Sequence, residues 1–300
     1  MTAPLHSRDI RGKGRWYGAC SEDCPFGNDL LISVTNAQGV INKPALPPAA
    51  AKETAKAAWD RLPQMVSTSR QPLNGPNGCD KARVADRCGE CRFCVNAAIK
   101  AEYKQQWEAK ADLGTLIHAH AAAAVIGQPM VMDPVVEPFI RQYVRFLKAY
   151  RVNLTEHIEA VETTILHRKA GYAGTGDLWI WLPTGAGGKY ELALVDLKTS
   201  LTKPATAVYP DQILQLAGLR FAPEAILPDD SVVKVPKFAR TFLLNLRQND
   251  FALIEVPADR AAHSAFVHAV GLQRFMQDVD TKTWPVTSPP GAAAVNRRVA

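Results

Sequence analysis

The chain has 300 residues, of which 47% are hydrophobic and 21% are charged, and its formal net charge is +6. This composition is typical of a folded protein and excludes a disordered chain. No run approaches the roughly 18 to 20 apolar residues of a membrane span, and the N-terminal MTAPLHSRDIRGKGRW has no apolar signal segment. We therefore expect a soluble, cytoplasmic protein with no membrane partner. The positive surplus is compatible with a polyanionic partner but is also common in proteins that bind none.

The cysteines are clustered. Cys79, Cys88, Cys91 and Cys94 follow the pattern C-x8-C-x2-C-x2-C, and Cys20 and Cys24 lie upstream. In a reducing compartment, clustering favours metal binding over disulfides, and four thiolates suit zinc or an iron–sulfur cluster. Zinc is favoured because the most N-terminal of the four lies in the same loop and could close a small tetrahedral site. Four free thiols on a mobile insert are the other reading, and the pattern assigns no role to the upstream pair.

The N-terminal part contains few regular elements. We expect a strand at Leu30–Thr35, a helix at Ala49–Leu62 anchored by Trp59, and a loop at Ser67–Asn77. Residues 1–66 are interpreted as a segment packing on the core, 67–95 as a Cys-rich metal-binding insert, and 96–280 as the core domain. Residues 281–300 are interpreted as a flexible tail.

Two helices are expected next, at Val95–Ile126, which contains His118, and at Phe139–Val152. The second helix has an apolar side and a basic stripe without an intervening acidic residue. The stripe consists of Arg141, Arg145 and Lys148. It could follow the phosphates of DNA or be an ordinary solvated face.

The sequence from residue 176 to residue 200 predicts a hairpin. Two apolar runs, Leu178–Leu182 and Leu192–Val195, flank a glycine-rich stretch. Side chains alternate faces along a strand, so Asp196 and Lys198 share a face, and the predicted register sets Asp177 opposite residue 195 or 196. The two carboxylates and the lysine can therefore converge.

Carboxylates in a half-buried sheet cost several kcal/mol unless cations or hydrogen bonds compensate them. A divalent metal ion would compensate, and Lys198 could orient or deprotonate a water molecule or hold a phosphate. The plain alternative is that Asp177 caps a turn while Asp196 and Lys198 face solvent.

The remaining elements alternate between strands and helices. HIEAVETTILHRK, with Glu162, predicts a strand before the hairpin, and Tyr209–Phe221, with Gln215, predicts a helix after it. RTFLLNLRQ and FALIEVP predict a second hairpin, and a last helix is expected around Ala262–Asp278. This order predicts a mixed α/β domain of the α+β type.

In this order, the elements resemble those of the PD-(D/E)XK nuclease superfamily. The likeness is to the RecB-like branch, including phage exonucleases similar to CRISPR-associated RecB-type nucleases. It covers roughly residues 30–280 and is strongest over 111–221. The resemblance implies a restriction-endonuclease-like core, a mixed central sheet flanked by helices.

The resemblance rests on short motifs. GTLIH with His118 looks like the motif whose histidine helps to hold metal, and VETTI with Glu162 looks like the acidic position before the core hairpin. GTGD with Asp177 looks like the metal-binding aspartate. VDLKTS, with Asp196 and Lys198, looks like the (D/E)XK element itself.

Two features depart from the family pattern. QLAGL with Gln215 resembles a glutamine–tyrosine motif that contacts DNA near the site, but Leu219 stands where a tyrosine is common. In several relatives, an iron–sulfur cluster draws one cysteine from before the core and three from after it. All six cysteines here precede His118, which favours a separate, lineage-specific zinc site.

The resemblance also implies the ligands and the chemistry. His118, Asp177, Asp196 and the backbone carbonyl of Leu197 would hold one or two Mg²⁺ (or Mn²⁺) ions, with Glu162 as a further ligand, directly or through water. Lys198 would assist the attack of water on the phosphate, and the product would carry a 5′-phosphate.

The implied function is a metal-dependent DNA exonuclease in phage or prophage recombination, repair or DNA processing. DNA is the implied partner, and a phage recombination protein such as a single-strand annealing protein is a candidate second one, in a bacterial host cell if the gene is phage-borne. The rival hypotheses are a structure-specific endonuclease and a catalytically inactive DNA-binding or assembly protein. The intact Asp177, Asp196 and Lys198 argue against the inactive protein.

Overall fold

The computed structural model describes residues 6–22, 24–71, 88–185, 188–280 and 284. These residues form two compact units, one of residues 42–117 and the other of residues 2–41 together with 118–300. Described residues before 42 pair into the central sheet, and the described parts of 42–117 are helical, while the expected boundaries at 66/67 and 95/96 stay predictions. Of the expected tail, the structure describes Trp284 alone, and the rest lies outside the described residues.

The unit of residues 42–117 is helical. It contains α2 (Leu46–Asp60), α3 (Leu62–Thr68) and the first part of α4 (Arg92–Ile126). Prolines in the first turns of α2 and α3 fit the helix start, where a backbone N–H is not needed. Its small core contains Ala57, Val95 and Ile99. Trp59 was expected to anchor this helix, and that was wrong, because the small Ala57 faces the core and Trp59 is 74% exposed.

The second unit is built on a ten-stranded mixed sheet, which confirms the predicted fold class of a central sheet flanked by helices. The strands are β1 (Ser7–Ile10), β2 (Gly14–Gly18), β3 (Leu30–Ser33), β4 (Ile158–His167), β5 (Tyr172–Pro183), β6 (Tyr190–Thr199), β7 (Glu224–Ile226), β8 (Val232–Lys234), β9 (Arg240–Leu246) and β10 (Phe251–Glu255). The helices of this unit are α1 (Val34–Ala37), η1 (Gln38–Val40), the end of α4, α5 (Glu137–Ala149), α6 (Pro210–Arg220) and α7 (Arg260–Asp278).

The predicted hairpins are both present, as β5–β6 and β9–β10. The strand order is β1-β2-β3-β5-β4-β7-β8, with β6 pairing β5 and β9, and with β10 beyond β9. The β3–β5 and β6–β9 pairs are parallel, and the others are antiparallel. The β1–β2 and β7–β8 pairs were not predicted, because strands of three to five residues carry too little periodicity to be recognised.

The pairing of β5 leaves an opening in the sheet. One edge of β5 pairs with β4 along most of its length. On the other edge, β3 pairs only at Tyr172 and Ala173, and β6 pairs only from Leu178 onward. Neither strand therefore pairs with Gly174–Asp177, because β3 ends at Ser33 and the pairing of β6 with β5 ends at Val195.

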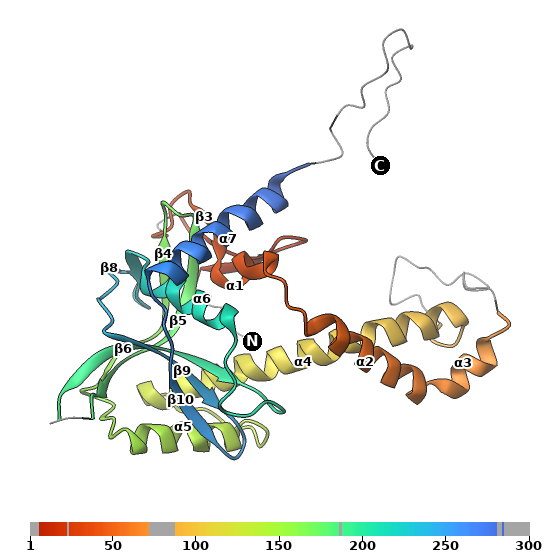
Figure 1. The fold of residues 1–300 in the computed structure, drawn as a ribbon, viewed down its shortest axis with the longest axis horizontal. Helices are drawn as coiled ribbons and strands as arrows, with labels where there is room; N and C mark the ends of the chain where they lie inside the picture. The colour runs from red at the N-terminus through yellow and green to blue at the C-terminus, as the bar shows by residue number, and fades with distance from the viewer. Residues whose placement is uncertain (1–5, 23, 72–87, 186–187, 281–283, 285–300) are drawn as a thin grey trace, which may run out of the picture. The chain divides into compact units, whose positions relative to one another are not determined.

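Helices α6 and α7 lie side by side against the sheet (Figure 1). Leu216 and Leu219 of α6 and Phe266 of α7 belong to the main buried core. Gly218 permits this close contact, because a Cβ atom there would lie 2.7 Å from the Phe266 ring. Its carbonyl also accepts a hydrogen bond from the Tyr172 hydroxyl at 2.8 Å, so α6 is fixed to both α7 and β5.

Helix α5 packs against β9 and β10. Its buried side includes Tyr143 and Phe146, and the Phe146 ring meets that of Phe251 edge-on at 6.1 Å. Among the described helices, none has the length and apolar content needed to cross a membrane.

Candidate active site

Three metal-ligating side chains meet at the opening beside β5. His118 Nδ1 lies 3.4 Å from Asp177 Oδ1 and 4.0 Å from Glu162 Oε1. The three residues come from α4, β4 and β5, and one ligand atom from each lies within 4.8 Å of the other two. This group could hold a metal ion.

The strand register places the two carboxylates opposite each other. The pairs Val161–Leu178 and Thr163–Gly176 flank Glu162 and Asp177 on either side. Glu162 has a φ of 49°, in the left-handed region that a side-chain-bearing residue rarely adopts within a strand. Strain of this kind concentrates at functional sites, where the surrounding structure maintains it.

A second cluster lies on β6 and α6, at the expected (D/E)XK element. The Lys198 ammonium donates to Gln215 Oε1 at 3.0 Å, and Gln215 Nε2 donates to Asp196 Oδ1 at 3.1 Å. Lys198 Nζ also lies 2.7 Å from Asp196 Oδ2. The amide of Gln215 therefore connects the two charged side chains of the element.

The backbone of Leu197 links the two clusters. Its N–H donates to Asp177 Oδ2 at 2.6 Å. This contact follows from the hairpin register, because the last paired residues are Leu178 and Val195, so Asp177 and Asp196 occupy the next opposed positions. In a strand, the N–H and C=O of one residue point to the same side, so the Leu197 carbonyl is directed toward the Asp177 side. Metal binding by this carbonyl stays a prediction.

Asp196 is the most deeply buried carboxylate of the site, with 2% of its side chain exposed. Its Oδ2 receives no hydrogen bond from the described residues, although the Lys198 ammonium is close enough for an ion pair. The sequence pattern grouped Asp196 with His118 and Asp177 as ligands. In the structure, Glu162, expected as a further ligand, lies in the three-residue group, and Asp196 contacts Lys198 and Gln215, so metal binding by Asp196 stays a prediction.

The neighbouring charges change the acidity of the first cluster. Burial alone would lower the pKa of His118, but the charges of Asp177 and Glu162 raise it to about 9. Burial and the nearby Asp177 raise the pKa of Glu162 to about 8. Without a metal ion, His118 and Glu162 therefore each hold a proton more tightly than the free side chains do.

In the second cluster, the pKa of the acid and the pKa of the base are both raised. Burial raises the pKa of Asp196 to about 6, even though Lys198 opposes the shift. Burial would lower the pKa of Lys198, but Asp196 and Asp177 raise it. The pKa of Asp177 is lowered, because His118, Lys198 and the Leu197 N–H outweigh the cost of burial. Lys198 is thus an ammonium ion in this arrangement.

Gln215 lies in the site as its motif predicted, and Leu219 does not. Leu219 is 1% exposed and belongs to the main core between α6 and α7. A tyrosine at this position would have to displace core side chains. The position where the family commonly has a tyrosine is therefore filled by a leucine that packs in the core.

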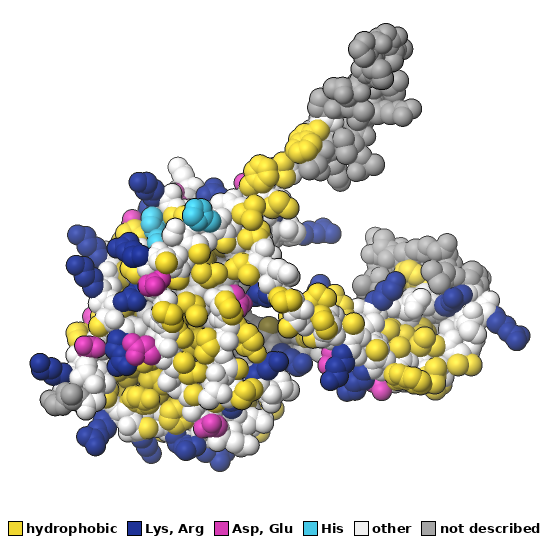
Figure 2. Space-filling model, in the orientation of Figure 1, with side chains coloured by type: hydrophobic (Ala, Val, Ile, Leu, Met, Phe, Trp, Pro, Cys, Tyr) yellow, Lys and Arg dark blue, Asp and Glu magenta, His cyan; other side chains and the backbone are white. Residues whose placement is uncertain are grey.

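The basic stripe on α5 is exposed but not unopposed. No acidic residue lies between Arg141 and Lys148, as expected, but Arg141 pairs with Glu137, one turn before the stripe, at 3.2 Å. Arg145 donates to Gln142 Oε1 at 2.6 Å, and Lys148 is exposed. Figure 2 shows Lys and Arg side chains distributed over the visible face and not gathered in one patch.

Three of the four clustered cysteines form a second group that could hold a metal ion. Cys88, Cys91 and Cys94 lie at the start of α4, and their sulfur atoms lie within 4.8 Å of one another. The Cys91 N–H donates to Cys88 Sγ at 3.3 Å. The expected fourth ligand, Cys79, lies outside the described residues.

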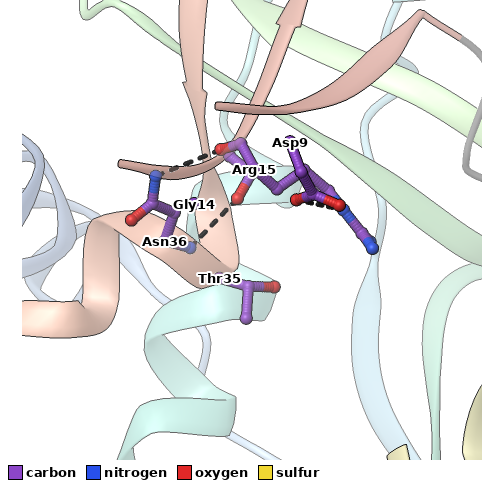
Figure 3. A pocket seen from close by; sticks show the side chains of 6 residues that line it. Asp9, Gly14, Arg15, Thr35 and Asn36 are labelled. Atoms are coloured by element: carbon purple, nitrogen blue, oxygen red, sulfur yellow. Dashed lines mark hydrogen bonds and ion pairs between the residues drawn. The ribbon is translucent and has the colours of Figure 1, made fainter. Parts of the chain in front are cut away.

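An open depression of about 310 Å³ lies at the N-terminal hairpin (Figure 3). Its Asn36 donates to the carbonyls of Lys13 and Arg15, and Arg15 lies 4.0 Å from Asp9. These side chains hold the hairpin in place, and the depression includes none of the predicted site residues.

No family model matches the chain, and no curated protein matches it. Among the solved structures that match is one described as "Crystal structure of SSO0001", at 13% identity and a TM-score of 0.27. The match covers 55% of this chain and 87% of that chain. A likeness at this TM-score carries no argument about function.

Sequence reasoning did not anticipate His6, which lies beside Cys20 and Cys24. The histidine precedes the first of these cysteines by fourteen residues. No common ligand spacing connects them, so only the folded hairpin reveals the group.

Proposed function

We propose that the chain is a divalent-metal-dependent deoxyribonuclease of the PD-(D/E)XK superfamily, acting as a DNA exonuclease. One observation carries the proposal, the convergence of the predicted motif residues from five elements at the opening beside β5. They are His118, Glu162, Asp177, Asp196, Lys198 and Gln215. A buried carboxylate beside a lysine that is 24% exposed, with two further carboxylates close by, is costly for stability, so a chemical role explains their presence better than packing does.

The donor set fits a hard divalent cation. His118, Glu162 and Asp177 supply one nitrogen and carboxylate oxygens, and Asp196, whose Oδ2 pairs with Lys198 at 2.7 Å, occupies the position on β6 opposed to Asp177. Oxygen-rich sites suit Mg²⁺ and Mn²⁺. When bound, such a cation lowers the pKa of a water molecule and neutralises charge on the phosphate.

Lys198 is proposed to position the reacting groups. Its raised pKa keeps it an ammonium ion, which can hold a phosphate oxygen or orient the attacking water but does not accept a proton. Gln215 fixes this ammonium and the Asp196 carboxylate relative to each other. Asp177, fixed by the Leu197 N–H, keeps its charge for the cation.

The decisive experiment compares DNA with and without ends. A linear duplex labelled at either end, and the same DNA as a closed circle, are incubated with Mg²⁺ or Mn²⁺. The wild-type protein is compared with Asp196→Ala and with Asp9→Ala, a control at an exposed aspartate of β1.

We expect wild type and Asp9→Ala to degrade the linear DNA from its ends and to spare the circle. Asp196→Ala should be inactive but still bind DNA. Cleavage of the circle would show that the protein acts as an endonuclease and not as an exonuclease. If all three proteins bind DNA equally and none cleaves it in a metal-dependent way, the proposed nuclease activity is refuted.

For the cysteine group, we propose Zn²⁺ held by Cys88, Cys91 and Cys94 with Cys79 as the fourth ligand. The alternative is an iron–sulfur cluster, because thiolates also hold iron. Elemental analysis of protein purified without oxygen distinguishes them. Zinc without iron supports the proposal, and iron with visible absorption supports the cluster.

A further inference from the structure

A third group of metal-ligating side chains lies at the N-terminal hairpin and shares no residue with the other two. His6 Nδ1 lies 3.2 Å from Cys20 Sγ and 3.3 Å from Cys24 Sγ, and the two sulfur atoms are 3.6 Å apart. We propose that His6, Cys20 and Cys24 form a zinc site. One imidazole and two thiolates are a donor set that zinc commonly takes.

The second ring nitrogen of His6 has the partner that a metal-binding histidine needs. His6 Nε2 lies 2.9 Å from Asp230 Oδ1, and the His6 side chain is 1% exposed. Donation from Nε2–H to the carboxylate leaves the Nδ1 lone pair facing the two sulfur atoms. Without a metal ion, the Cys24 thiol can donate to this lone pair and the Cys20 thiol to Cys24 Sγ, and a metal ion would take the place of both protons.

The loop that carries the cysteines is fixed by a distant part of the chain. Arg168, just after β4, donates to the carbonyl of Pro25 at 2.7 Å and to that of Phe26 at 3.4 Å, and it also pairs with Asp29. The buried Phe26 ring packs 5.4 Å from the His6 ring. The ligand positions are therefore organised by contacts that do not require the metal.

The carboxylate that orients His6 is held by a tight turn between β7 and β8. The Asp230 N–H donates to the Leu227 carbonyl at 2.9 Å, and the Leu227 N–H donates to the Ser231 carbonyl at 3.0 Å. Asp230 has a φ of 65° and His6 a φ of 61°, a conformation that aspartate and histidine adopt more readily than most residues with side chains. The turn therefore fixes the position of the Asp230 carboxylate.

The described residues supply three ligands, so a tetrahedral zinc ion would keep one position for water or another donor. A disulfide between Cys20 and Cys24 is the competing use of the two thiols. It requires a sulfur separation of about 2.05 Å, and the two sulfur atoms are 3.6 Å apart.

The first test uses the unaltered chain. Reduced full-length protein is alkylated with and without Zn²⁺ after removal of bound metal by a chelator, and the modified cysteines are identified by mass spectrometry. We expect Zn²⁺ to protect Cys20 and Cys24 together. Equal alkylation of both with and without Zn²⁺ overturns the proposal, and so does their recovery as a disulfide after incubation with Zn²⁺.

The second test addresses the orienting carboxylate. Asp230→Asn is compared with Asp229→Asn, its neighbour, whose carboxylate bonds to Ser231 and not to His6. Both changes are made in a Cys91→Ser chain, so that the group on α4 does not obscure the titration. Zn²⁺ affinity is measured by competition with a chromophoric chelator.

We expect Asp230→Asn to weaken Zn²⁺ binding by about 10- to 100-fold, as outer partners of metal-bound histidines do, and Asp229→Asn to leave it unchanged. Equal affinities in the two variants overturn the role of Asp230 and the site with it. If the Cys91→Ser chain does not fold, the alkylation of the unaltered chain decides the question.

Discussion

The candidate active site and the cysteine group on α4 are built in opposite ways. Cys88, Cys91 and Cys94 lie within one short segment at the start of a single helix. The candidate active site draws residues from α4, β4, β5, β6 and α6, between His118 and Gln215. The first group depends on local spacing, and the second depends on how distant elements meet.

This difference determines what can disrupt each region. Cys88 and Cys91 lie in the short segment just before α4 and Cys94 lies in its first turn, so the group depends on a few neighbouring residues and not on the rest of the chain. The candidate active site depends instead on strand register, because a slip of one residue would turn Asp177 or Asp196 to the other face of the sheet. Substitutions should therefore affect the two regions independently.

The largest effect is expected from Asp177→Asn. The change removes the charge that His118 and the Leu197 N–H surround, and with it the affinity for a divalent cation. A bound cation is worth several kcal/mol in the transition state, so cleavage of linear DNA should fall by about 10³-fold or more. The initial cleavage rate with Mn²⁺ measures this change.

The matched control is Asp9→Asn, at an exposed position of β1, which should cleave at the wild-type rate. Metal content at the cysteines should be the same in both variants. A cleavage rate for Asp177→Asn within a few-fold of wild type would show that this carboxylate is not a cation ligand.

Cys91→Ser should have the complementary effect. It removes a buried thiol of the group on α4, so the metal bound there should be lost and the thermal stability of residues 42–117 should fall. Metal analysis and calorimetry measure the two effects. Ala97→Ser, on the same helix, is the control.

The rate of DNA cleavage per folded molecule should stay within about twofold of wild type in Cys91→Ser, because distant independent sites act additively. A proportional loss of cleavage and of metal would instead show that the two regions are coupled.

A smaller effect is expected from Gln215→Ala. Its amide positions Lys198 and Asp196 and is not itself a cation ligand in the described arrangement. Loss of such an outer contact typically costs about 10- to 100-fold in activity or metal affinity. Gln215→Glu should not restore activity, because a carboxylate cannot donate to Asp196 as the amide does. Full activity of Gln215→Ala would contradict the positioning role.

The smallest effect concerns pH in the absence of divalent ions. The folded-state pKa of Asp196 is raised to about 6 and that of Glu162 to about 8. The folded protein therefore retains protons that the unfolded chain has released, so stability should decrease as pH rises from about 5 to 8. Urea unfolding of the metal-free protein at several pH values measures the decrease.

Glu162→Gln, which cannot ionise, should show less of this decrease than wild type. The difference should stay below about 1 kcal/mol, because 38% of the Glu162 side chain faces solvent and water weakens the effect. Mg²⁺ should reverse the trend in wild type, because it binds the deprotonated ligands. A larger decrease in Glu162→Gln than in wild type would contradict the proposed protonation.

Much of the fold could be predicted from local patterns. The β5–β6 hairpin follows from two apolar runs around a glycine-rich loop, and α5 follows from its regular apolar spacing. The short strands β7 and β8 were missed because three residues carry no period. Trp59 was misplaced, because composition does not reveal which side of an alanine-rich helix faces the core.

The candidate site was predicted residue by residue, but its internal arrangement was not. The motifs identified Glu162 as a secondary ligand, and the structure places it in the three-residue group instead. Its left-handed backbone has no sequence signal, because glutamate does not favour that conformation. The pairing of Arg141 with Glu137 was also missed, because Glu137 lies just before the expected helix start at Phe139.

The sequence by itself determined the elements whose signals are local: the hairpin, the amphipathic helices and the cysteine spacing. Only the tertiary structure decided that Gly174–Asp177 pairs with neither β3 nor β6, and that His6 reaches Cys20, Cys24 and Asp230. The physical reason is that local patterns follow from the geometry of one helix or strand. Contacts between residues hundreds of positions apart, such as His6 and Asp230, depend on the packing of the whole unit.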